Sequence, residues 1–176
     1  MYKSVTFIRP RTAVVDLALI AAALLIPTLS HLTAWPVYRL NPMLLILLCG
    51  MLLTDSRRNS LMLAVALPMV SSVVVGMPAF GKAICMAAEL ATTASLYSQL
   101  PRRRRWPAVW GGMALSILCG KGVYYLLKGI FLGGAQEPSA PVWVPLLTVV
   151  VYSLLFALLT VWAPGSRGTQ CGHGRC

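Results

Sequence analysis

The chain has 176 residues, of which 58% are hydrophobic and only 11% are charged. A soluble domain carries about 25% charged residues, so the composition excludes an ordinary soluble domain and indicates a membrane protein. The formal net charge of +11 would suggest nucleic-acid binding in a soluble protein. Here the basic residues fall between apolar runs, where they orient the chain and meet anionic lipid headgroups. We therefore expect a lipid bilayer and no nucleic acid as a partner.

Apolar runs predict six transmembrane helices, because about 20 mostly apolar residues are needed to cross the hydrocarbon layer. The expected spans are residues 13–32, 42–54, 60–75, 78–100, 106–132 and 142–163. The second and third are short, and a short span crosses when it is buried among its neighbours or where the bilayer thins. The expected fold is an all-α membrane protein with a cytoplasmic segment 1–12, a six-helix domain 13–163 and a flexible cytoplasmic tail 164–176.

The distribution of lysine and arginine predicts the orientation. With six spans, one side of the membrane holds eleven of these residues: Lys3, Arg9, Arg11, Arg57, Arg58, Arg102, Arg103, Arg104, Arg105, Arg167 and Arg175. The other side holds Arg39, Lys82 and Lys128. Because cytoplasmic loops carry the excess of positive charge, both termini are expected in the cytoplasm.

The stretch GMPAFGKA, residues 76–83, has the G-x-x-x-x-G-K spacing that begins a nucleotide-binding phosphate loop. A true phosphate loop follows a strand and has Ser or Thr after the lysine, whereas this stretch follows an apolar helix and has Ala83. By the predicted topology it also faces the outside. Its glycines and Pro78 are expected instead to turn the chain and start the fourth helix.

Ionisable residues within the spans are the candidates for function. Glu89 lies about 16 Å along its helix from Pro78, at 1.5 Å per residue, which is near the middle of a bilayer. An ionisable group at that depth is costly and needs a partner or a polar cavity. Lys121 is its natural counter-ion, and Lys82 lies two turns earlier on the same helix face. Two interpretations stay open: an ion pair that only locks two helices together, or a polar cavity lined by these groups.

Three stretches carry a resemblance to a known family: NPMLLILLCGMLLTD, LPMVSSVVVGMPAFGKAICMAAELAT and GMALSILCGKGVYYLLKG. In their order, and with six spans, they resemble the substrate-binding S component of energy-coupling factor (ECF) transporters, which are bacterial vitamin importers. The strongest piece is G-M-P followed by a helix that carries Glu89-Leu90-Ala91. Leu44 and Lys121 stand where the family often has His and Arg, so no particular substrate is carried over.

The resemblance implies a multi-pass protein of the bacterial inner membrane that binds a vitamin or similar small nutrient from outside. A separate coupling subunit and two ATPase subunits would supply the energy, and the S component would topple to deliver its ligand inward. Family members meet the coupling subunit through small residues on the first helix, often Ala-x-x-x-Ala, which here matches Ala18 and Ala22. Small residues four apart let another helix approach closely, although they could equally pack the helix within its own bundle.

The expected ligand site has charged, polar and aromatic members near the outer face. Lys82 and Lys121 would favour an anionic group such as a carboxylate, and Glu89 would accept hydrogen bonds or balance charge. The remaining candidates are His31, Trp35, Asn41, Phe80 and Tyr124, since aromatic walls with a few polar groups are usual in small-molecule sites. His31 could equally be only a polar cap at the membrane boundary.

Catalysis, cofactors and resident metals are not expected. No Ser–His–Asp set, H-E-x-x-H motif or paired carboxylates occur in the spans. The tail CGHGRC offers two thiols and an imidazole, but a four-ligand zinc site needs one more group, so no metal site is assigned. The main alternative function is a non-catalytic membrane scaffold similar to the small basic subunit of the rod-shape complex, in which Lys82, Glu89 and Lys121 would matter only for stability.

Overall fold

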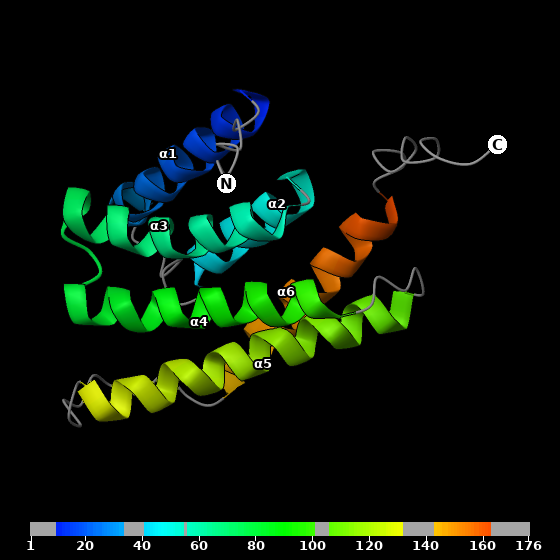
Figure 1. Ribbon diagram of the computed structural model, residues 1–176. Coiled ribbons are helices and arrows are strands. Elements are labelled where there is room, and N and C mark those ends of the chain that lie inside the picture. The colour runs from blue at the N-terminus through cyan, green and yellow to red at the C-terminus, as the bar shows by residue number, and fades with distance from the viewer. Residues whose placement is uncertain (1–9, 34–40, 55, 101–105, 132–142, 163–176) are drawn as a thin grey trace, which may run out of the picture.

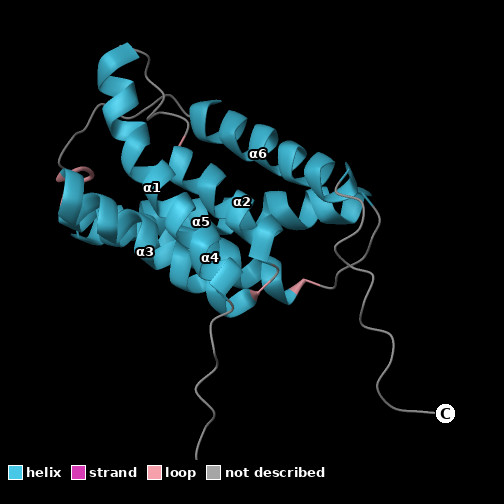
Figure 2. Ribbon diagram, turned by 90° about the horizontal axis from the view of Figure 1, so that it is seen from above, coloured by secondary structure: helices cyan, strands magenta, loops and turns pink. Residues whose placement is uncertain are grey.

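The computed structural model describes residues 10–33, 41–54, 56–100, 106–131 and 143–162, with side chains from Ala13 to Leu25 in the first helix and as far as Thr160 in the last. These residues form helices and short connections, with no strand among them (Figure 2). The helices are α1 (Pro10–Thr33), α2 (Pro42–Thr54), α3 (Arg57–Val75), α4 (Phe80–Gln99), α5 (Trp106–Phe131) and α6 (Trp143–Trp162). The all-α expectation is confirmed for this part of the chain.

The helix boundaries follow the apolar runs closely at some ends and differ at others. Helix α2 has the expected limits, and α5 begins at Trp106 as expected. Helix α1 begins at Pro10 rather than at residue 13, and α3 begins at Arg57 rather than at residue 60. Polar residues continue a helix readily, and Pro is well suited to a first helical turn. Apolar content alone therefore underestimates the length of both helices.

Helix α4 lies in the middle of the bundle (Figure 1). It packs mainly against α3 on one side and α5 on the other, and the three run in alternating directions. Helix α1 packs against α2 and α3, whereas α6 packs against α5 and also reaches α2. Helix α4 is therefore covered by neighbouring helices on two sides, which matters for the site described below.

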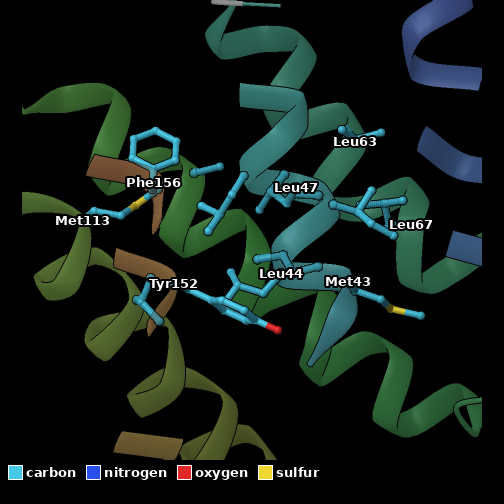
Figure 3. Packing of buried hydrophobic residues seen from close by; sticks show 14 of the residues in the cluster. Met43, Leu44, Leu47, Leu63, Leu67, Met113, Tyr152 and Phe156 are labelled. Carbon is cyan, nitrogen blue, oxygen red and sulfur yellow. The ribbon is translucent and has the colours of Figure 1, made fainter. Parts of the chain in front are cut away.

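The apolar core is centred on α2. Leu44 and Leu47 are fully buried, and side chains from α3, α5 and α6 surround them (Figure 3). Tyr97 of α4 meets Phe156 of α6 edge to face, with ring centroids 5.0 Å apart. The largest members of this core include Met43, Leu44, Leu47, Leu63, Leu67, Met113, Tyr152 and Phe156. A short helix of 13 residues is thus held by contacts on several sides rather than by its own length.

Apolar side chains also cover the outside of the bundle. Along α6 the exposed face is made of Leu146, Leu147, Val150, Val151, Leu154, Leu155, Leu158 and Leu159. A continuous apolar surface of this kind is unusual on a soluble monomer and suits a hydrocarbon environment. Three helices, within Arg57–Val75, Trp106–Phe131 and Trp143–Thr160, are long and apolar enough to cross a membrane. The structure therefore points to a membrane protein with an all-helical bundle.

A tight turn joins α3 to α4, as the glycine and proline residues predicted. Gly76 caps α3 in the left-handed conformation, with φ of 74°, and its N–H donates to the carbonyl oxygen of Ser72 at 3.1 Å. The Ser71 hydroxyl donates to the carbonyl oxygen of Met77 at 2.8 Å. The first bond satisfies a carbonyl at the end of α3, and the second ties the connection back to that helix.

Replacement of Gly76 by alanine is expected to destabilise the protein by about 1–2 kcal/mol, because a Cβ atom is disfavoured at positive φ. No heavy atom lies within 4 Å of the added Cβ, so the loss would come from the backbone conformation alone. The measurement is the midpoint of thermal unfolding in detergent. Gly81→Ala, also in open space but without positive φ, is the matched control and should not lower the midpoint. Equal losses in both variants would contradict the argument.

Candidate functional site

The site is built around Glu89, which stands halfway along α4 and is only 1% exposed. A carboxylate in an apolar bundle is tolerated only where charged or hydrogen-bonding groups surround it. Helix α4 packs between α3 and α5, and these two neighbouring helices account for the burial of Glu89.

Lys121 of α5 forms an ion pair with Glu89. Its Nζ atom lies 2.7 Å from Glu89 Oε1, and 16% of the lysine side chain remains exposed. The predicted pairing of these two residues is confirmed. Glu89 is therefore the more buried partner, and Lys121 is the partner that remains partly accessible.

Asn41 completes the cluster from a third segment of the chain. It immediately precedes α2, and its carbonyl oxygen accepts the Leu44 N–H at 3.0 Å in the first turn. Its φ of 49° is in the left-handed region, which Asn tolerates better than most residues. The side-chain Nδ2 donates to Glu89 Oε1 at 3.1 Å. The other amide atom, Oδ1, is buried and has no hydrogen-bond partner among the described residues.

Helices α4 and α5 make a close backbone contact beside Glu89. A Cβ atom added to Gly120 would meet Thr93 Oγ1 and would lie 2.8 Å from the backbone oxygen of Glu89. Thr93 itself donates its hydroxyl to that same oxygen at 3.0 Å. The absence of a side chain at Gly120 therefore lets the two backbones approach and places Lys121, the next residue, beside Glu89.

No family model, curated protein or solved structure matches the chain. The functional argument therefore rests on the sequence and on the geometry of the described residues.

Tyr124 and Lys82 both lie towards the α3–α4 turn from this cluster, because α4 and α5 run in opposite directions. Lys121 Nζ is 5.8 Å from the centroid of the Tyr124 ring, within the range of a cation–π contact. Lys82 is half-buried on α4. It shares the Glu89 face but lies roughly 10 Å away along the helix axis, at 1.5 Å per residue. Tyr124 is thus part of the immediate surroundings of the ion pair, and Lys82 is more distant.

Phe80 does not join the cluster, although it was expected to line the site. It is the first residue of α4 and is 61% exposed. Nine positions at 100° per residue place it on the opposite side of the helix from Glu89. An exposed aromatic at this position is better suited to contact with lipid or with another protein than to contact with Glu89.

The other expected residues lie partly or wholly outside the description. His31 belongs to α1, but its side chain is outside the described part, and Trp35 lies outside the described residues altogether, as does the CGHGRC tail. On α1, Ala18 is exposed and Ala22 half-buried, so the small-residue pair is turned at least partly outward. Among the described residues, no group of three potential metal ligands occurs together.

Sequence reasoning missed two features of the site. The first is the contact of Gly120 with Thr93, for which a glycine beside the charged Lys121 in an apolar helix was an available signal. The second is the hydrogen bond from Asn41 to Glu89, across 48 positions of sequence. Nothing local to Asn41 predicts its partner, because the contact depends on how α2 and α4 cross.

Proposed function

We propose that this chain is the substrate-binding S component of an ECF-type importer in a bacterial inner membrane. It crosses the membrane six times with both termini in the cytoplasm and captures a vitamin or similar small nutrient from outside. A separate coupling subunit and two ATPase subunits then supply the energy. The support is the sequence resemblance together with an apolar six-helix bundle that encloses a polar cluster.

One observation carries the proposal: three segments of the chain converge on a buried polar cluster that still has an unpaired polar atom. Glu89 comes from α4, Lys121 from α5, and Asn41 from the residue just before α2. A cluster that served only to lock helices would be expected to pair its buried polar atoms, since each unpaired one is destabilising. The unpaired Asn41 Oδ1 and the partly exposed Lys121 fit a site that is completed by a ligand.

The apolar exterior supports the membrane part of the proposal. Trp106 and Trp110 stack with centroids 6.4 Å apart at the start of α5, where both are partly exposed. Tryptophan favours the membrane–water boundary because its ring is apolar while its N–H can still be hydrogen-bonded. The proposed topology places this pair at the cytoplasmic boundary, beside the basic residues 102–105.

The outer face of α1 is the proposed contact for the coupling subunit. Ala18 is exposed and Ala22 half-buried, with larger exposed side chains at Leu17 and Leu25 beside them. A strip of small residues between larger ones lets a second helix approach closely. This role requires the resemblance as well as the geometry.

The first test is mass spectrometry of small molecules that heat releases from the protein purified in mild detergent. We expect about one vitamin-like compound per chain. Glu89→Ala should reduce its occupancy at least about tenfold, which corresponds to 1.4 kcal/mol of binding free energy, because the variant removes the group on which Lys121 and Asn41 converge. Gel filtration establishes that each variant is still folded.

Asn59→Ala is the matched control for this test. Asn59 also forms a bond between helices, from its Nδ2 to Asp16 Oδ1 at 2.8 Å, but it belongs to α3 and contacts α1 rather than Glu89. It should retain the compound. A wild-type protein that carries no compound after growth in rich medium, and shows no thermal shift with a panel of vitamins, would favour the scaffold function instead.

A further inference from the structure

The unpaired oxygen of Asn41 restricts the chemistry of the ligand. Asn41 is about nine-tenths buried, and its Oδ1 has no partner within the described residues. A carbonyl oxygen can only accept hydrogen bonds. Whatever completes this group must therefore bring an N–H or O–H donor.

The orientation of the amide is determined by its neighbour. Glu89 Oε1 is an acceptor and lies 3.1 Å from the Asn41 amide nitrogen. If the amide were turned over, two oxygens would face each other, one of them on a carboxylate. The NH₂ group therefore faces Glu89, and the oxygen is the atom left for a ligand.

The backbone holds this oxygen in place. The backbone carbonyl oxygen of Asn41 accepts a hydrogen bond from the Leu44 N–H. The left-handed φ of Asn41 sets the direction in which its side chain projects from the backbone. An acceptor fixed before binding loses little conformational freedom when a ligand arrives. The site is therefore preorganised for a donor at one position.

The charges of the cluster are already balanced. Glu89 and Lys121 are 2.7 Å apart and neutralise each other. A ligand carboxylate placed here would approach Glu89, and a ligand ammonium would compete with Lys121 for the same oxygen. An uncharged donor group meets neither obstacle. This differs from the sequence-based expectation that Lys82 and Lys121 would favour an anionic group such as a carboxylate.

We infer that the ligand presents an uncharged hydrogen-bond donor, such as an amide, ring N–H or hydroxyl group, to Asn41 Oδ1. This inference rests on the proposed binding function and defines the class of compound that the site selects. Any anionic part of the ligand would lie away from the Glu89–Lys121 pair.

The test uses the compound released from the purified protein and its N- or O-methylated analogue. Full-length protein that carries the compound is incubated with either the isotopically labelled compound or the analogue, and displacement is measured by mass spectrometry. The analogue should require at least about tenfold higher concentration, because methylation removes the donor and leaves Oδ1 unpaired. Asn41→Gly, which keeps the positive φ accessible but removes the amide, should abolish this discrimination and lower occupancy, whereas Asn59→Ala should change neither.

The outcomes separate this inference from the proposed function. A bound compound with no N–H or O–H group, equal displacement by the methylated analogue, or unchanged affinity in Asn41→Gly would overturn the inference and leave the binding function intact. The comparison of the two ligands on the wild-type protein decides the matter even if Asn41→Gly fails to fold. A wild-type protein that carries no compound and shows no thermal shift with a panel of vitamins would overturn both.

Discussion

Lys121→Met is expected to destabilise the protein by about 3–5 kcal/mol, the range found when one partner of a buried ion pair is removed. The variant leaves the Glu89 carboxylate 1% exposed, with the Asn41 amide as its remaining described side-chain partner. In a chain of this size, the thermal midpoint should fall by roughly 10 °C, at about 2–4 °C per kcal/mol. Size-exclusion chromatography after heating in detergent measures this change.

The double variant Glu89→Gln with Lys121→Met is the control for that experiment. It removes both charges and retains an acceptor for the Asn41 amide. If the loss in Lys121→Met comes from an uncompensated carboxylate, the double variant should recover much of the stability. A double variant as unstable as the sum of the two single changes would show that the side chains matter for packing rather than for their charges.

Gly120→Ala is expected to cost about 1–3 kcal/mol, as is typical when extra volume enters a packed interior. The added methyl group would lie 2.8 Å from the backbone oxygen of Glu89 and would collide with Thr93 Oγ1. Backbone cannot move aside as a flexible side chain can, so α4 and α5 must separate. On the proposed function, ligand occupancy should fall together with the thermal midpoint, because the separation displaces Glu89 from Lys121.

Gly122→Ala is the matched control, two residues further along α5. An added Cβ there has no heavy atom within 4 Å, so only the change in helix propensity remains. Alanine is favoured over glycine in helices by about 1 kcal/mol, and this variant should be as stable as the wild type or slightly more so. If the two variants lost stability equally, a general sensitivity of α5 to substitution would replace the close-contact explanation.

The helix order could be predicted because long apolar runs separated by polar or Gly/Pro-containing segments leave few alternatives in a chain with so little charge. The ends were less predictable. Arg57 and Arg58 form the first turn of α3, yet they look like loop residues when only apolar content is considered. Likewise, α4 begins at Phe80, two residues after the proline that was expected to start it.

The pairing of Glu89 with Lys121 could be predicted, because it follows from the depth of the two residues along their helices. A single acidic residue within an apolar helix requires a partner, and Lys121 was the available cation at a similar depth. The position of Phe80 could not be obtained in this way, because depth does not specify the side of the helix. The hydrogen bond between Asn41 and Glu89 could not be predicted either, because it depends on how α2 and α4 cross.

The composition of α4 has a consequence for the synthesis of the protein. This helix is not among the three that are apolar enough to cross a membrane by themselves. Thr92 and Thr93 already direct their hydroxyls to carbonyl oxygens of their own helix, but Glu89 needs Lys121, which is made 32 residues later. On the proposed six-span topology, α4 becomes stable in the bilayer only once α5 has emerged from the ribosome. Insertion and folding of the central helices would then be a single coupled step.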